Sequence, residues 1–119
     1  LEAVRRSARR LHVFCQGGAI HVPKQGQVLL AHLESCVVEV AAPRGGVFHP
    51  KLWVLQYEPG PEATGSAEHF RLLVGTRNLT FDRSWDTLLR LDGESTPGGR
   101  AVDENEPLAK FVRALPGLA

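Results

Sequence analysis

Residues 47–58, VFHPKLWVLQYE, are predicted to form a long strand, because apolar, aromatic and β-branched side chains fill most of the segment. Pro50 near its beginning indicates an edge position or a bulge, since proline cannot donate a hydrogen bond to a neighbouring strand. Side chains alternate between the two faces of a strand, so His49 and Lys51 are predicted to project to the same side. Two such bases could hold one anionic group between them; the alternative is a pair of surface residues at a fraying strand end.

A second polar cluster is predicted at the end of a strand over 69–78, which reads HFRLLVGTRN. In that strand Thr76 and Asn78 share a face, beside Gly75, whose missing side chain lets another backbone approach closely. A lysine charge together with neutral hydrogen bonds from Thr and Asn suits the non-bridging oxygens of a phosphate. An antiparallel pairing with the first strand, across the polar loop between them, would place this cluster beside the two basic side chains.

The remaining pattern predicts an α/β layered domain, with a mixed sheet flanked by helices. The sheet is expected to contain strands at 36–43, 47–58, 69–78 and 85–92, and a further short strand is predicted at 11–16. Helices are predicted over 1–10, over 24–35 and from Asp103, with a helical turn at 79–84. In the last helix one apolar face is expected, formed by Leu108, Phe111, Val112 and Leu115, with Pro107 in the first turn.

The 119 residues are 43% hydrophobic, which is enough for one compact core, so a single domain is expected. The chain holds no methionine and begins at Leu1, which we interpret as the N-terminal half of a longer protein. Its net charge of +1 is too close to neutral to indicate nucleic-acid binding through bulk electrostatics. Neither an apolar run of about 18 residues nor a signal-peptide pattern is present, so a cytoplasmic protein without a membrane partner is expected.

Several charged or reactive side chains are predicted to have ordinary structural roles. The basic cluster at the start is expected to be a solvated helix face, formed by Arg5, Arg6, Arg9 and Arg10. Two cysteines are too few for a disulfide framework, and we expect reduced core thiols at Cys15 and Cys36. The remaining histidines share no metal-ligand spacing: His12, His21, His32 and His69.

The two polar segments together, His49-Pro50-Lys51 and Gly75-Thr76-Arg77-Asn78, match the pattern H-x-K followed by G-[ST]-x-N. In this the sequence resembles the phospholipase D superfamily over about residues 11–93, and bacterial phospholipase D-like proteins and tyrosyl-DNA phosphodiesterase most closely. Many members carry an aspartate after the lysine, where this chain has Gln56. Tyrosyl-DNA phosphodiesterases also lack that aspartate, so the departure favours their branch.

The resemblance implies a phosphodiesterase that needs no metal or other cofactor, in which His49 attacks phosphorus and forms a phosphohistidine. A neutral imidazole is a competent nucleophile near pH 7, because its unperturbed pKa is about 6.5. Lys51 and Asn78 then belong to the catalytic set, and Asp86 is the candidate for orienting the histidine, with a turn-forming aspartate as the alternative. Substrate contacts are expected from Gly75 and Thr76. Trp53 could stack a base or line the pocket, although core packing is the favoured interpretation.

The family uses two H-x-K motifs, and this chain contains one. A second motif is therefore expected from a downstream half, which we favour, or from a homodimer partner. Nucleic acid is the favoured substrate, for a nuclease or a DNA end-processing enzyme. The alternatives are hydrolysis or transfer on a phospholipid headgroup, and a catalytically idle fold used as a binding or dimerisation module.

Overall fold

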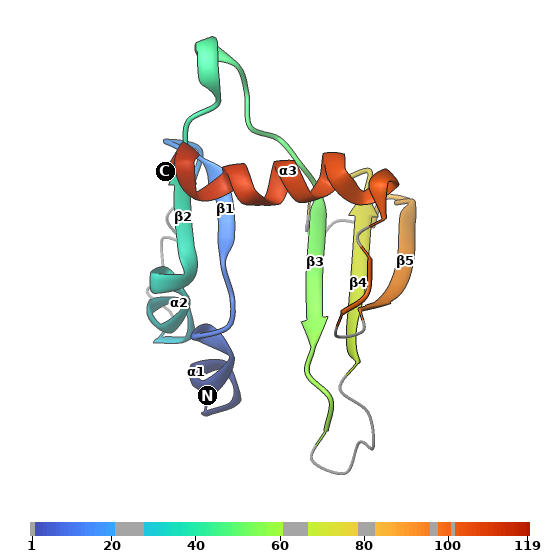
Figure 1. Cartoon of the computed structure of the whole chain (residues 1–119). Helices are drawn as coiled ribbons and strands as arrows, with labels where there is room; N and C mark the ends of the chain where they lie inside the picture. Colours follow the sequence, from blue (N-terminus) through green and yellow to red (C-terminus); the bar gives the residue numbers. More distant parts are fainter. Residues whose placement is uncertain (1, 21–27, 61–66, 79–82, 96–97, 101) are drawn as a thin grey trace. The chain divides into compact units, whose positions relative to one another are not determined.

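The computed structural model describes residues 2–20, 28–60, 67–78, 83–95, 98–100 and 102–119. The backbone forms two compact units (Figure 1). Unit 1 comprises Leu1–His49 together with Asp103–Ala119, and unit 2 comprises Pro50–Val102. Each unit has its own sheet, of two strands in unit 1 and three strands in unit 2. The predicted α/β class is therefore confirmed, whereas the predicted single mixed sheet is not observed.

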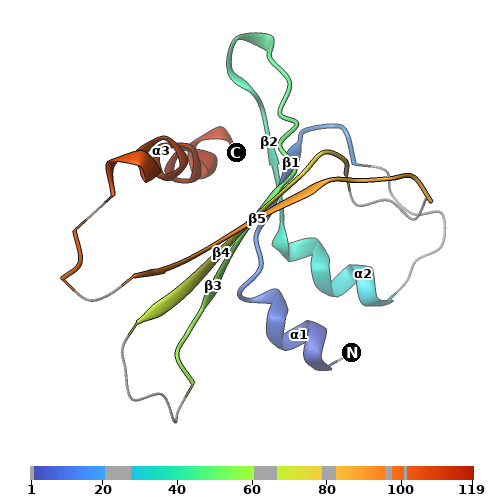
Figure 2. The ribbon, with the colours of Figure 1, turned by 90° about the vertical axis from the view of Figure 1, so that its right-hand side faces the viewer.

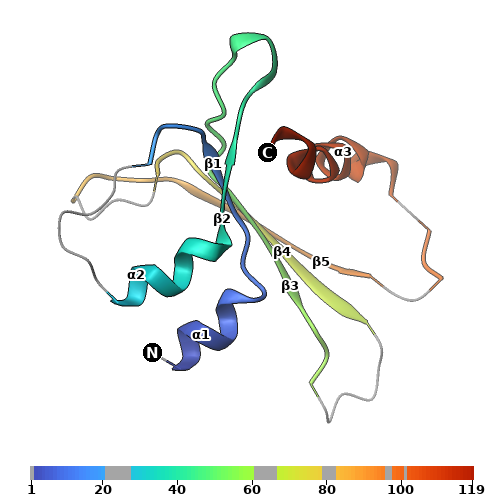
Figure 3. The ribbon, with the colours of Figure 1, turned by 90° about the vertical axis from the view of Figure 1, so that its left-hand side faces the viewer.

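Unit 1 is built around a small parallel sheet. Its regular elements in chain order are α1 (Glu2–Ala8), β1 (Val13–Gln16), α2 (Val28–Leu33), β2 (Val37–Val40) and α3 (Glu106–Ala114). The pairing of β1 with β2 runs from Val13 opposite Val37 to Gln16 opposite Val40. Parallel strands need a crossover connection, and α2 lies within it. Figure 2 and Figure 3 show α1 and α2 side by side.

The core of unit 1 joins β2 to the C-terminal helix. Val40, Phe48 and Leu115 are buried, and Phe111 packs against them. The rings of Phe48 and Phe111 are stacked, with centroids 6.5 Å apart and planes 8° from parallel. The Phe48 backbone N–H also donates to Gln16 Oε1 at 2.7 Å. The residue directly before the H-x-K motif is thus held by both a ring contact and a hydrogen bond.

Unit 2 is a three-stranded antiparallel sheet in the order β3-β4-β5 (Figure 1). The strands are β3 (Leu52–Tyr57), β4 (Glu68–Gly75) and β5 (Leu88–Ser95). Leu52 lies opposite Val74, and Val74 lies opposite Leu89. The prediction that the two motif strands are adjacent and antiparallel is therefore confirmed.

Both motif strands are shorter than predicted. The first begins only at Leu52, so His49 precedes the strand and strand alternation does not determine its direction. Pro50 lacks an N–H to donate to a ladder, which explains the late start. The second ends at Gly75, so Thr76 and Asn78 follow the strand and the predicted shared face does not apply to them.

The prediction that 36–43 belongs to the sheet of the motif strands is wrong. The strand in this segment, β2, pairs with β1 instead. It ends at Val40, and the chain then enters a turn in which Arg44 and Gly45 have positive φ angles of 59° and 71°. Such a turn cannot continue a strand, and it separates β2 from the H-x-K segment.

The other boundaries differ by a few residues. The strand predicted at 85–92 begins only at Leu88. In the segment 24–35 the described residues form α2 and a following 3₁₀ turn, Glu34–Cys36. The rest of that segment, 24–27, lies outside the described residues, as do residues 79–82 of the predicted helical turn. The final helix follows a 3₁₀ turn over Asp103–Asn105 and has Pro107 in its first turn, as predicted.

The two cysteines are both free thiols, as predicted. Cys36 is buried, and its Sγ donates to Ala8 O at 3.2 Å, which ties the end of α1 to the 3₁₀ turn before β2. Cys15 is half-buried on β1, where its thiol donates to Val38 O at 3.7 Å. Burial raises the pKa of the Cys15 thiol, and the nearby Glu39 carboxylate adds to the effect. The four arginines of the N-terminal cluster are all exposed, which agrees with a solvated face.

Candidate functional site

The start of β3 and the end of β4 meet at one hydrogen bond. Gly75 N–H donates to Lys51 O at 2.8 Å, one pair beyond the last strand pair of Leu52 with Val74. On its other side Gly75 lies opposite Leu88, the first residue of β5. The lysine of the first motif and the glycine of the second are therefore cross-strand neighbours, which agrees with the predicted antiparallel pairing of the motif strands. Because the bond from Gly75 continues the ladder by one pair to Lys51, alternation places Lys51 on the same face of the sheet as Trp53.

Beyond Gly75 the backbone is held by a network around Asp86. Thr76 N–H donates to Thr87 O at 3.2 Å and to Asp86 Oδ1 at 3.3 Å. The Thr76 hydroxyl donates to the same Asp86 oxygen at 2.5 Å, and it accepts a bond of 3.3 Å from Thr87 N–H. Side chains that bond to nearby backbone groups compete with strand pairing. The network therefore explains why β4 ends at Gly75 and β5 begins only after Thr87.

This network changes the roles expected for two of the site residues. A hydroxyl has a single donor, and that of Thr76 is used on Asp86. Donation from Thr76 to a phosphate would require this bond to break. Two roles were considered for Asp86. Its hydrogen bonds with Thr76 are those of a turn-forming aspartate, whereas its orientation of His49 stays a prediction.

The pKa of the Asp86 carboxyl is lowered from its ordinary value. The hydrogen bond from the Thr76 hydroxyl contributes most to lowering its pKa, and the backbone N–H groups of Thr87 and Thr76 and the charge of Arg77 lower it further. A Cβ built on Gly75 would lie 3.9 Å from Asp86 Oδ2, so the anionic group stands beside the strand end. A carboxylate repels phosphate and attracts an imidazole or ammonium N–H. Any anion bound at this end must therefore be attracted by the cationic groups, Lys51 among them.

The remaining predicted residues occupy different positions. His49 is exposed and is the last residue of unit 1 before Pro50 opens unit 2, so its predicted approach to Asn78 stays a prediction. Asn78 is exposed and follows β4. A Cβ at Gly75 would meet Arg77 O at 3.4 Å, an ordinary contact, so the glycine is not required by crowding within the described residues.

The favoured prediction of core packing for Trp53 is wrong. Its side chain lies on β3 with 43% of its surface exposed. Trp85, whose location the sequence left open, is 98% exposed in the segment that leads to Asp86. Both large rings are thus accessible to a ligand. Trp53 is exposed because it lies on a face of the sheet that also carries charged side chains.

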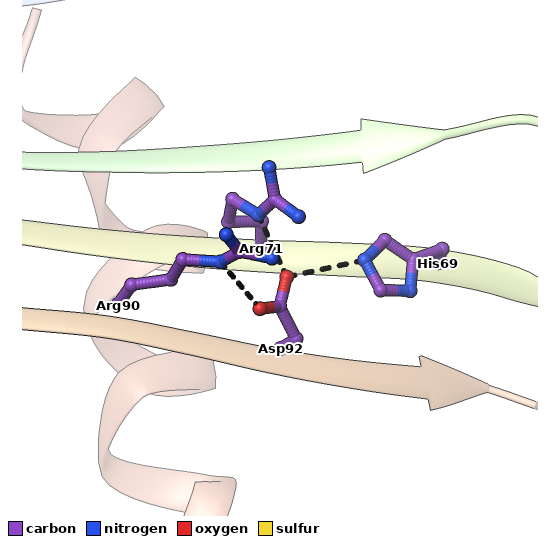
Figure 4. Close-up of polar contacts among 4 residues, drawn as sticks. All are labelled: His69, Arg71, Arg90 and Asp92. Carbon is purple, nitrogen blue, oxygen red and sulfur yellow. Dashed lines mark hydrogen bonds and ion pairs between the residues drawn. The ribbon is translucent and has the colours of Figure 1, made fainter.

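Sequence reasoning missed a charged cluster on this same face. Figure 4 shows His69, Arg71 and Arg90 directed at the carboxylate of Asp92. Arg71 Nε donates to Asp92 Oδ1 at 2.7 Å, Arg90 Nε donates to Oδ2 at 2.6 Å, and His69 Nε2 lies 3.2 Å from Oδ1. The bonds from Arg71 and Arg90 lower the pKa of Asp92 to about 2. The register of β4 with β5, which places Arg71 opposite Asp92, would have revealed the cluster had it been known.

In the described part of the chain, no group of three or more His, Cys, Asp or Glu side chains is placed to hold a metal ion. No described helix combines the length and apolar character needed to cross a bilayer. Comparison with known proteins finds no matching family model, no matching curated protein and no matching solved structure. Function is therefore inferred from the residues and their geometry.

Proposed function

We propose that this chain is one half of a metal-independent phosphodiesterase of the phospholipase D type, acting on nucleic acid as a nuclease or an end-processing enzyme. The observation that supports the proposal is the bond from Gly75 N–H to Lys51 O at 2.8 Å. It brings the lysine of H-x-K and the glycine of G-T-R-N to one end of one sheet. The motifs are separated by 23 residues between Lys51 and Gly75, so this meeting depends on the fold and not on local sequence.

In the proposed reaction the neutral imidazole of His49 attacks phosphorus and forms the P–N bond of a phosphohistidine. The P–O bond to the leaving group breaks, and a second histidine, protonated, gives its proton to the departing oxygen. Water then attacks the phosphohistidine while the second histidine takes one of its protons. This step breaks the P–N bond, releases a phosphomonoester and restores both histidines.

The chain's own residues supply one side of this site. The Lys51 ammonium offsets the charge that develops on the non-bridging oxygens, and Asn78 donates to one of them from its carboxamide. Asp86 accepts the N–H of the His49 ring nitrogen that does not attack, which keeps the other nitrogen unprotonated. The second H-x-K comes from another segment of the protein or from a second copy of this chain.

Hydrolysis of bis(4-nitrophenyl) phosphate tests the proposal without assuming a natural substrate. The assay compares the 119-residue chain alone, the chain at increasing concentration, and the chain joined to a segment that carries a second H-x-K. We expect activity where two motifs are present, its loss in His49→Asn, and no effect of EDTA. His12→Asn, an exposed histidine of unit 1, is the matched control and should retain activity.

Loss of activity in EDTA would refute the metal-independent mechanism. Equal rates in His49→Asn and His12→Asn would refute the assignment of the nucleophile. A chain that is folded by circular dichroism but stays inert when a second motif is supplied would refute the proposed activity. The remaining interpretation would then be a catalytically idle binding module.

A further inference from the structure

One face of the unit 2 sheet carries basic, aromatic and acidic side chains in cross-strand rows. Cross-strand partners point to the same side of a sheet, so the register defines the rows. Trp53, Leu73 and Arg90 form one row; Leu55, Arg71 and Asp92 the next; Tyr57, His69 and Glu94 the third. Lys51, opposite Gly75, precedes the first row. We call this surface, defined by these rows and Lys51, the basic-aromatic face.

The rows lead away from the candidate site. Residues on one face of a strand are two positions apart, or about 7 Å along the strand. The sequence of side chains from the site outward is a cation at Lys51, a ring with a cation at Trp53 and Arg90, and a cation at Arg71. A second ring, Tyr57, follows. From Trp53 to Tyr57 the face therefore offers a ring, a charge and a ring along a length of about 14 Å.

The two guanidinium groups are held in place by Asp92 (Figure 4). Each donates its Nε–H to that carboxylate, at 2.7 Å from Arg71 and 2.6 Å from Arg90. Nε–H is one of five donors on a guanidinium, so the bond fixes each group without using all its donors. Arg71 Cζ also lies 5.7 Å from the centroid of the Tyr57 ring.

The side chains of the basic-aromatic face are more exposed than those of a sheet surface that packs into a core. Trp53 and Tyr57 are each 43% exposed, and the Arg90 side chain is 57% exposed. Up to the row of Arg71, the cations Lys51, Arg71 and Arg90 face one carboxylate, that of Asp92. An ion cluster that served only to stabilise the sheet would not require two half-exposed aromatic rings on either side of it.

We propose that the basic-aromatic face binds single-stranded nucleic acid and leads it to the candidate site. Bases stack on Trp53 and Tyr57, and the phosphates between them lie against Arg71, Arg90 and Lys51. Aromatic rings interleaved with cations suit a single strand, because its bases are free to stack and every base has a π-face. The choice of nucleic acid rests on the proposed function, whereas the location on this face rests on the register and exposure.

The test is the affinity of the 119-residue chain for a fluorescein-labelled oligothymidylate of about eight nucleotides, measured by anisotropy. Trp53→Ala and Tyr57→Ala should each weaken binding by at least about 5-fold, the lower end for loss of one stacked base. The control is Val54→Ala, an exposed position of the same strand on the opposite face, which should bind as the parent does. Equal affinity of Trp53→Ala and Val54→Ala would overturn the proposal.

Salt dependence tests the cations separately. In a plot of the logarithm of the binding constant against the logarithm of the salt concentration, Arg90→Gln should make the negative slope shallower by about 0.7. This is the value for one phosphate contact on a single strand. Arg113→Gln, an exposed arginine of α3, should leave the slope unchanged. An abasic oligomer of equal charge should bind more weakly than oligothymidylate, and equal binding of the two would exclude stacking.

Accessibility of Trp53 excludes another occupant of the face. In a Trp85→Phe background all tryptophan emission comes from Trp53, which acrylamide should quench readily and oligothymidylate should quench on binding. A ring shielded from acrylamide would show that protein covers the face and would overturn the proposal. The anisotropy assay measures binding and does not depend on hydrolysis. A chain that hydrolyses the nitrophenyl ester but does not bind oligothymidylate would therefore refute the proposed role of the basic-aromatic face and leave the proposed chemistry intact. Affinity without hydrolysis would refute only the proposed chemistry.

Discussion

Removing the Phe48 side chain is expected to destabilise unit 1 and loosen the entry to the H-x-K motif. The ring is 9% exposed and stacks on Phe111 at 6.5 Å, and it is one of three hydrophobic residues in the buried cluster. Phe→Ala changes in cores cost about 3–5 kcal/mol of unfolding free energy. The cluster is small and can partly collapse into the space, so we expect a cost near the lower end, about 3 kcal/mol.

Urea unfolding followed by circular dichroism at 222 nm measures this cost, because all the described α-helices lie in unit 1. With a slope of about 1–2 kcal/mol per molar urea, the midpoint should fall by roughly 1.5–3 M. Val47→Ala is the matched control: its side chain is 79% exposed, so its effect should stay within about 0.5 kcal/mol. Equal midpoints for Phe48→Ala and Val47→Ala would refute the assignment of Phe48 to the core.

Two further predictions concern the carboxylates of unit 2. Because its pKa is lowered from 3.8 to about 2, Asp92 should stabilise the fold above its ordinary pKa, and this contribution should disappear as pH falls from about 4 to about 2. Thermal unfolding should show this loss in the parent and in Glu94→Gln, whereas Asp92→Asn should lack it; identical pH profiles would contradict the ion cluster. Thr76→Val should raise the pKa of Asp86, measured by carboxyl NMR titration, while Thr76→Ser should leave it lowered. An unchanged Asp86 titration in Thr76→Val would exclude the hydroxyl bond as the main cause.

The pairing of the motif strands was predictable because their apolar runs are long. β3 spans 6 residues and β4 spans 8, and the polar loop between them favours antiparallel neighbours. The strand ends were not predictable in this way. They depend on Pro50, which cannot donate to the ladder, and on Asp86, whose side chain binds backbone that would otherwise extend the sheet.

The partner of β2 was not predictable either. A run of 4 residues, such as Val37–Val40, carries no information on which other strand it will join, and the choice of β1 is settled by long-range packing. The charged cluster was hidden for a related reason. Arg71 meets Asp92 only in the observed register, and a slip of one residue would send the two side chains to opposite faces.

The H-x-K motif spans the junction between the two units, and this gives Pro50 a specific role. Phe48 is fixed in the core of unit 1, and Lys51 is fixed to the sheet of unit 2 through its bond to Gly75. Only His49 and Pro50 lie between these anchors. Proline fixes its own φ near −65°, and it restricts the residue before it to extended conformations. The backbone of the proposed nucleophile is therefore restricted by the proline that follows it.

Replacing that proline should impair the proposed chemistry more than the fold. Pro50 is exposed, so Pro50→Gly should leave the urea midpoint of unit 1 nearly unchanged. Misplacement of a catalytic group by about 1 Å can cost on the order of 100-fold in rate, so the loss of this constraint should slow nitrophenyl ester hydrolysis by about 10-fold or more. Pro59→Gly, an exposed proline beyond the far end of β3, controls for the general effect of glycine. Equal rates in the two variants would show that His49 is positioned by contacts of its own side chain, and that the link contributes nothing to its orientation.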